Sequence, residues 1–144
     1  MNAIRSLLGL KRWREDEAKN RFALLLRDLG AEEKRLAHME GQFKSVSGRL
    51  EFKADEPVDI GEIGKLNEYL GHLGERIRRQ KKVIEGKERR VEEARNNLVD
   101  ATKERKIFER LDEKQREAME KEYRRKEQIR TDEHAATRHR RHER

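Results

Sequence analysis

The sequence has 144 residues, of which 47% are charged, 33% are hydrophobic and only 5% are aromatic. So few apolar side chains cannot fill a multilayered globular core, which argues against a bulky enzyme fold. The 37 basic and 30 acidic residues are interleaved, and balanced charges at helical spacing support helices. The chain has no cysteine and therefore no disulfide framework or thiolate chemistry. We expect a folded, elongated, helical protein of a reducing compartment.

The N-terminal segment, MNAIRSLLGLKRWRE, does not have the form of a signal peptide. Its apolar run is too short, and no small-residue cleavage site follows it. No later window reaches the roughly 18 apolar residues of a membrane span, so we expect a cytoplasmic protein. The segment fits either a weak interfacial anchor or the first turns of a packed helix. Its apolar residues are Ile4, Leu7, Leu8, Leu10 and Trp13, flanked by Arg5, Lys11, Arg12 and Arg14.

A first long helix is predicted over about residues 4–50. From Ala18 onward, apolar residues recur at alternating steps of four and three, which is the spacing of a coiled-coil seam. Nine of the ten positions are apolar, and the polar one is Glu32. This first seam consists of Ala18, Phe22, Leu25, Leu29, Glu32, Leu36, Met39, Phe43, Val46 and Leu50.

A second long helix is predicted over about residues 59–136. The same alternation runs from Ile63 to Phe108, with polar interruptions at Gln80, Lys87 and Arg105. This second seam consists of Ile63, Leu66, Leu70, Leu73, Ile77, Gln80, Ile84, Lys87, Val91, Ala94, Leu98, Ala101, Arg105 and Phe108. Two such seams predict two helices that pack against each other.

A turn is predicted between the helices, at about residues 51–58. Pro57 disfavours helical geometry in the residue before it. Asp59, followed three residues later by Glu62, has the form of a capping box that opens a helix. Such a short connection favours an antiparallel hairpin in which the seams face each other. The predicted fold class is therefore all-α, with residues 1–144 in a single antiparallel coiled-coil domain.

The second helix is predicted to overhang the first at its C-terminal end. If Leu50 lies opposite about Ile60, the first helix ends near residue 110 of the second. Helix-forming sequence continues to about Ala136 and is followed by a basic tail at 137–144. The overhanging part has too few apolar residues for a core of its own, so we expect it to meet another protein. These residues are Leu111, Ala118, Met119, Tyr123 and Ile129.

No motif in the sequence indicates an enzyme. The segment IGEIGK lacks the spacing of a phosphate-binding loop, and none of the five histidines belongs to an HExxH motif. A two-helix rod also has no concave cavity from which water could be excluded. We therefore expect no catalytic residue, no metal site and no cofactor.

The most basic segment is residues 76–90, RIRRQKKVIEGKERR, with eight basic and two acidic side chains. Such a run fits the solvated flank of a coiled coil, a surface for an acidic protein, or a nucleic-acid contact. A basic-zipper protein would place a continuous basic helix ahead of a parallel zipper, and this chain does not. Nucleic acid is therefore not an expected partner.

Three segments resemble those of the FliJ family, the small coiled-coil stalk of the bacterial flagellar type III export ATPase. They are NEYLGHLGERIRRQKKVI near the start of the second helix, VEEARNNLVDATKERKIFERLDEK in its middle, and RRKEQIRTDEHAA near its end. Two positions depart from the family pattern. Thr131 stands where an apolar residue usually precedes the Asp-Glu pair, and Arg76 occupies a position of the gate-contact strip where a small residue is usual.

The resemblance implies a non-enzymatic export component, held at the inner membrane only through the export complex. The family inserts its joined chain ends into a hexameric ATPase ring, promotes ring assembly and contacts the export gate, with export chaperones as further implied partners. The implied ATPase-ring contacts are Glu109, Asp112, Arg116, Arg124, Arg125, Asp132 and Glu133. The implied export-gate contacts are Tyr69, Leu73, Arg76 and Gln80, of which Leu73 also fits the second seam.

Three other functions stay open at this level. A stalk of a virulence-type secretion system would share the fold and the role. A passive coiled-coil adaptor would space two partners without changing ATP turnover. A nucleic-acid-binding rod would rest on residues 76–90 and lose affinity steeply with salt. The polar seam positions also leave the oligomeric state open; we expect a monomer, which a dimer seen by light scattering at micromolar concentration would contradict.

Overall fold

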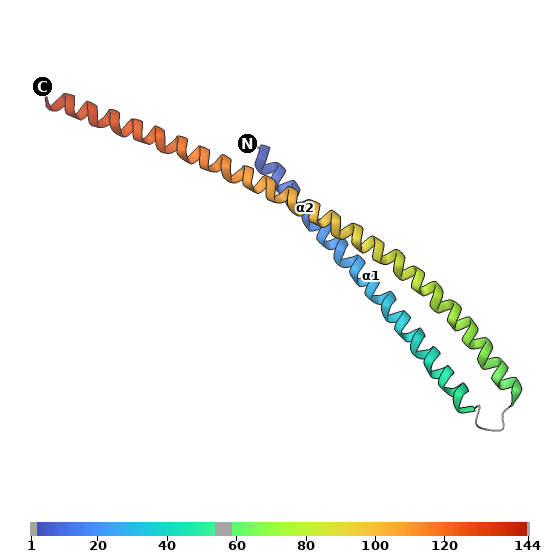
Figure 1. The fold of residues 1–144 in the computed structure, drawn as a ribbon. Helices are drawn as coiled ribbons and strands as arrows, with labels where there is room; N and C mark the ends of the chain where they lie inside the picture. The colour runs from blue at the N-terminus through green and yellow to red at the C-terminus, as the bar shows by residue number, and fades with distance from the viewer. Residues whose placement is uncertain (1–2, 54–58, 144) are drawn as a thin grey trace. The chain divides into compact units, whose positions relative to one another are not determined.

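The computed structural model consists of two long helices (Figure 1). It describes residues 3–53 and 59–143. Helix α1 spans Ala3–Lys53 and helix α2 spans Ile60–His142, and the described residues contain no strand. The two helices pack against each other as a helical hairpin, so the predicted all-α fold is confirmed.

Helix α1 ends later than predicted. It continues to Lys53, so residues 51–53 of the predicted turn are helical. The rest of that turn, residues 54–58 with Pro57, lies outside the described residues. Asp59 opens helix α2 as its N-cap, because its carboxylate oxygen accepts a hydrogen bond from the Gly61 backbone N–H at 3.1 Å.

Helix α2 also ends later than predicted. It continues to His142, so the predicted basic tail at 137–144 is helical as far as that residue. One local feature favours the extension: the basic last turn is favourable at the negative end of the helix dipole.

The contacts divide the chain into two compact units. Unit 1 comprises Met1–Asp16 and Asp100–Arg144, and unit 2 comprises Glu17–Val99. Each unit contains a segment of α1 and a segment of α2, and therefore has a helix–helix seam of its own.

The interior of unit 2 is the predicted coiled-coil seam. Every predicted seam residue from Ala18 to Leu50 and from Ile63 to Leu98 is at least partly buried. Leu73 is the most enclosed, with 1% of its surface exposed. The other buried apolar residues of this unit are Ile84, Val91 and Ala94. Both predicted seams are thus confirmed in unit 2.

The polar seam residues of unit 2 find polar partners across the interface. The Gln80 side-chain amide donates to the backbone carbonyl of Glu32 at 3.0 Å and also to its carboxylate. The Lys87 ammonium lies 3.8 Å from the carboxylate of Asp28. The interruption in the first seam therefore faces an interruption in the second, which favours this one alignment of the two helices.

In unit 1 the seam extends beyond the predicted positions at both ends. The steps of four and three lead back from Ala18 to Glu15, Lys11, Leu8 and Ile4, and forward from Phe108 to Asp112 and Gln115. All six are at least partly buried, with Leu8 only 3% and Asp112 only 4% exposed. Apolar periodicity does not reveal these positions, because four of the six residues are polar.

Beyond this seam, helix α2 of unit 1 is uncovered. Every residue from Arg116 to Glu143 is exposed, and we call residues 116–143 the uncovered segment. The predicted overhang is confirmed, but it begins after Gln115 instead of near residue 110.

The predicted register between the helices is wrong in both units. It placed Glu32 opposite Arg78, whereas Glu32 binds Gln80, and it placed Glu15 opposite Arg95, whereas Glu15 binds Arg105. The offset is small in unit 2, where the later end of α1 at Lys53 accounts for it. In unit 1 it is larger, and other contacts share it: the Lys11 ammonium lies over the Phe108 ring, nine residues beyond the position predicted to face Lys11.

Candidate contact surfaces

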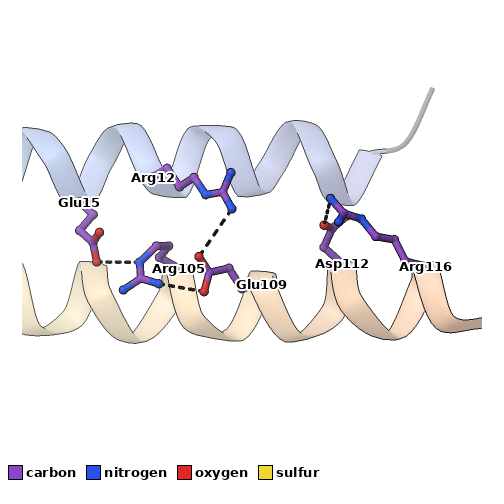
Figure 2. A network of polar contacts seen from close by, with 6 residues as sticks. All are labelled: Arg12, Glu15, Arg105, Glu109, Asp112 and Arg116. Carbon is purple, nitrogen blue, oxygen red and sulfur yellow. Dashed lines mark hydrogen bonds and ion pairs between the residues drawn. The ribbon is translucent and has the colours of Figure 1, made fainter.

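A chain of alternating charges joins α1 to α2 in unit 1 (Figure 2). The Arg105 guanidinium lies 2.9 Å from the carboxylate of Glu15 on α1 and 2.9 Å from that of Glu109 on its own helix. Glu109 is also 3.6 Å from the guanidinium of Arg12. The hydrogen bond with Glu15, and after it that with Glu109, raises the pKa of Arg105. This charge chain holds the first turns of α1 against α2.

A second contact between the same two segments is formed by Lys11. Its ammonium is 2.8 Å from the carboxylate of Glu104 and 5.4 Å from the centre of the Phe108 ring. The hydrogen bond and charge of Lys11, and to a smaller extent the charge of Arg14, lower the pKa of Glu104. The lysine thus combines an ion pair with a cation–π contact at a seam position.

Asp112 is a buried carboxylate near the start of the uncovered segment. One oxygen pairs with the guanidinium of Arg116 (Figure 2), and the two groups are 3.1 Å apart. The other has no hydrogen-bond partner among the described residues, and the same is true of the Gln115 side-chain oxygen. The covered part of unit 1 therefore ends in two acceptors that its own described residues leave unsatisfied.

The uncovered segment is supported by ion pairs and hydrogen bonds within one helix. The guanidinium of Arg125 is 2.9 Å from the carboxylate of Glu122, and this contact lowers the pKa of that carboxyl. The Gln128 amide donates to Asp132 at 3.2 Å. Contacts three and four residues apart each stabilise an isolated helix by about 0.2–0.5 kcal/mol. They let this segment stay helical without a covering helix.

The seven residues predicted to contact an ATPase ring fall into two groups. Glu109 and Asp112 belong to the covered part of unit 1, where Arg12, Arg105 and Arg116 bind them. The other five are exposed on the uncovered segment: Arg116, Arg124, Arg125, Asp132 and Glu133. The structure therefore places two of the seven residues in the covered part of unit 1 and five on the uncovered segment.

The four residues predicted to contact an export gate also divide. Leu73 is 1% and Gln80 is 9% exposed, so both belong to the helix–helix seam of unit 2. Tyr69 and Arg76 are exposed beside that seam. Of the four predicted gate-contact residues, only Tyr69 and Arg76 therefore have exposed side chains.

Tyr69, Arg76 and the edge of Gln80 line one wall of a groove of about 650 Å³ in unit 2. The opposite wall comes from α1 and was not predicted. It consists of Lys34, Arg35, His38, Met39 and Gln42. Arg35, His38 and Gln42 each directly precede a residue of the first seam, just as Tyr69 and Arg76 precede residues of the second. This shared spacing is the sequence signal that could have identified the second wall.

Residues 3–53 and 59–143 contain neither a metal site nor a helix that could cross a membrane. No group of three or more histidine, aspartate or glutamate side chains is placed to hold a metal ion. No helix in the same ranges is both long and apolar enough to cross a membrane.

Together, the two seams and the uncovered segment define an antiparallel coiled-coil protein in which a charged segment of α2 is not covered by α1. The family described as "Flagellar FliJ protein" matches residues 1–144. The chain belongs to this FliJ family, a family of non-catalytic export components, and is a coiled-coil protein associated with flagellar type III export. No curated protein and no solved structure matches it.

Proposed function

We propose that the chain acts as a central-stalk-like component that inserts the end of unit 1 into the hexameric flagellar export ATPase. In this role it promotes assembly and activity of the ring at the cytoplasmic side of the inner-membrane export apparatus. The observation that carries the proposal is the uncovered segment, residues 116–143, which is helical as far as His142 and in which every residue is exposed. A helix of this kind suits a channel whose walls replace the missing covering helix.

The character of the uncovered segment supports a contact that is repeatedly made and broken. Its large apolar residues are few, namely Met119, Tyr123 and Ile129. Its charges are exposed, and exposed ion pairs each contribute roughly 0–1 kcal/mol. Contacts this weak can exchange between successive subunits of a ring, whereas a large apolar interface would hold the stalk in one position.

We assign the ring-contact residues two different roles. Arg116, Arg124, Arg125, Asp132 and Glu133 are exposed and contact the ring directly. Glu109 and Asp112 act as positioning residues, because they join α1 to α2 or link to Arg116 at the base of the uncovered segment.

The export-gate contact is proposed to lie in the groove of unit 2. Tyr69 and Arg76 provide one wall, and the α1 residues Lys34, Arg35 and His38 provide a basic opposite wall. A groove with this lining suits an acidic segment that carries an apolar or aromatic side chain. Export chaperones are further proposed partners, but no surface of the chain is assigned to them.

ATP hydrolysis by the export ATPase of the same organism tests the ring contact. The full-length chain is compared with a chain that ends at Gln115, which keeps the covered part of unit 1. We expect stimulation by the full-length chain and none by the shortened one. Equal stimulation by both would show that the uncovered segment is not the active part, and no effect of either would favour a passive adaptor.

Paired arginines provide a matched control for this assay. Arg124→Ala with Arg125→Ala removes two exposed charges of the uncovered segment, and we expect weaker stimulation. Arg78→Ala with Arg79→Ala removes two similarly exposed arginines of unit 2 that pair with Glu75. An equal loss in both variants would point to a general effect of net charge.

Binding to the cytoplasmic domain of the export-gate protein tests the groove. Tyr69→Ala with Arg76→Ala should weaken binding, whereas Lys82→Ala with Val83→Ala, outside the groove lining, should not. Gate binding that survives the first variant unchanged would place the gate contact elsewhere.

A further inference from the structure

The uncovered segment has two parts that differ in how their charges are compensated. Residues 116–133 carry six basic and six acidic side chains, and each of their four arginines lies within 4.0 Å of a carboxylate on the same helix. Residues 134–143 carry three arginines and one glutamate. That glutamate, Glu143, pairs with His139 at 3.1 Å, which leaves the three arginines without an ion-pair partner among the described residues. We call Arg138, Arg140 and Arg141 the arginine cluster.

The helix dipole alone does not account for the arginine cluster. The C-terminal end of a helix is equivalent to roughly half a negative charge, and its effect falls off within the last turn. Residues 134–143 carry two more positive than negative formal charges even when their histidines are neutral, and Arg138 precedes the last turn. The cluster therefore holds more positive charge than the helix end requires, and this surplus is exposed to an anionic partner.

The arginines of the cluster project from different sides of α2. A helix turns by about 100° per residue, so Arg138 and Arg140 lie about 160° apart around the helix axis. They also line different grooves. Arg138 and His134 line one of about 760 Å³, and Arg140 and Arg141 line another of about 480 Å³. A flat surface contacts only one of these sides, whereas a partner that surrounds the helix contacts all of them.

The composition of the uncovered segment indicates the chemistry of that partner. Residues 134–143 have no apolar side chain larger than alanine, so apolar burial cannot hold a partner here. The guanidinium group of arginine pairs best with carboxylates and phosphates. A phosphate backbone running along α2 would be repelled by the six carboxylates of residues 116–133. Carboxylates gathered around residues 134–143 alone avoid this repulsion.

We propose that a collar of carboxylates, contributed by several copies of one protein chain, encloses the arginine cluster. This inference rests on the proposed insertion into the ATPase ring, and it names the chemistry of the channel around residues 134–143. Every subunit of a hexamer supplies the same acidic side chain, so the collar presents carboxylates on all sides of the helix. The arginines on opposite sides of α2 then find partners at every rotational position of the stalk.

The affinity of the full-length chain for the hexameric export ATPase of the same organism tests the collar. Arg138→Gln with Arg140→Gln and Arg141→Gln should weaken binding by about tenfold at low salt. Because the lost contacts are electrostatic, about 0.5 M NaCl should remove most of the difference between this variant and the unchanged chain. All three side chains are exposed, and circular dichroism verifies that the helices are retained.

A matched control removes the same charge from exposed arginines of unit 2. The control is Arg78→Gln with Arg79→Gln and Arg89→Gln, and it should bind the ring as the unchanged chain does. An equal loss in the control and in the cluster variant would mean that the ring responds to net charge alone, and would overturn the proposal.

Variants at two opposite positions test whether the partner encloses the helix. Arg138→Gln and Arg140→Gln, made singly, should each weaken binding by about twofold to threefold. A loss in only one of them would mean that the partner contacts one side, and the collar would be wrong. Arg138→Lys with Arg140→Lys keeps both charges and supplies amines that a carbodiimide can join to touching carboxylates. Mass spectrometry should find both lysines linked to acidic residues of the ATPase, and a link to neither would contradict the collar.

The outcomes separate the collar from the proposed function. If the cluster variant binds the ring and stimulates ATP hydrolysis as well as the unchanged chain does, the collar is wrong and the ring contact stands. If the unchanged chain does not bind the ring, both are wrong. Binding of a labelled single-stranded oligonucleotide that is lost in the cluster variant, while ring affinity is kept, would instead assign the arginine cluster to nucleic acid.

Discussion

The two units use the same helices but differ in what fills their seams. Unit 2 is held by leucine, isoleucine, valine and alanine, with one glutamine bound to one glutamate at its polar level. Unit 1 places Lys11, Glu15, Arg105 and Asp112 at seam positions and holds α1 to α2 through the charge chain and the Lys11 contacts. Apolar burial contributes more to stability than partly exposed ion pairs. Unit 2 is therefore the stable part of the chain and unit 1 the part that opens first.

The largest expected effect is the loss of a core side chain in unit 2. Leu73→Ala removes the most enclosed side chain and should lower the free energy of unfolding by about 2–4 kcal/mol. Leu8→Ala in unit 1 should lower the global value less, because α1 can fray locally from its nearby end. Urea unfolding followed by circular dichroism measures both. Equal losses would mean that the two units unfold together, and would contradict the difference in stability between them.

Replacing Glu32 and Gln80, the polar pair in the seam of unit 2, should have a smaller and non-additive effect on the free energy of unfolding. Glu32→Leu or Gln80→Leu alone leaves a polar group with fewer partners and should cost about 1 kcal/mol. The double replacement should be neutral or stabilising, because two leucines pack where two polar groups met. A double-mutant cycle measures the coupling. Purely additive costs would show that the hydrogen bonds seen between the two side chains do not contribute.

Glycine replacements should sharpen the contrast by about 0.5–1 kcal/mol at most. A Cβ added at Gly86 in unit 2 or at Gly9 in unit 1 meets no atom within 4 Å. Gly86→Ala should therefore raise the free energy of unfolding by about 0.5–1 kcal/mol. Gly9→Ala should change the free energy of global unfolding less, and should mainly slow hydrogen exchange of the amides near residue 9. A lower free energy of unfolding for Gly86→Ala would mean that the site has less room for a methyl group than the structure shows.

The smallest expected effect concerns the acid response of unit 1. Lys11 lowers the pKa of Glu104 from its usual 4.5, so this ion pair contributes stability above that pH and loses it as the pH falls through the folded-state pKa. Carboxyl NMR should show Glu104 titrating below its usual range, and Lys11→Gln should move it back. High salt should likewise speed amide exchange in residues 3–16 more than in unit 2. An unchanged Glu104 titration in the variant would contradict the Lys11 contact.

The comparison also explains which features could be predicted from the sequence. The seam of unit 2 was predictable because its residues are apolar at a fixed spacing. The seam of unit 1 was only partly predictable, because Glu15 and Asp112 occupy buried positions that a search for apolar periodicity ignores. The register was wrong in part because it depended on where α1 ends, three residues later than predicted, and helix ends are poorly fixed by composition.

The candidate sites were predictable to a similar extent. Family resemblance indicated Tyr69 and Arg76, but the α1 wall of the groove became visible only when the two helices were placed together. Leu73 and Gln80 fitted both a contact strip and a seam, and their burial assigns them to the seam. The spread of the ring-contact residues over covered and uncovered parts also depends on the real end of the seam, at Gln115.

The ion pairs within the uncovered segment have a consequence for the kinetics and energetics of recognition. Because residues 116–142 already form a helix, a partner does not have to order them, and the entropy of folding is not subtracted from the binding free energy. Association can then be quick and reversible even when each contact is weak. A prefolded helix also transmits a push or a rotation applied at one end, which a chain that folds on contact would absorb.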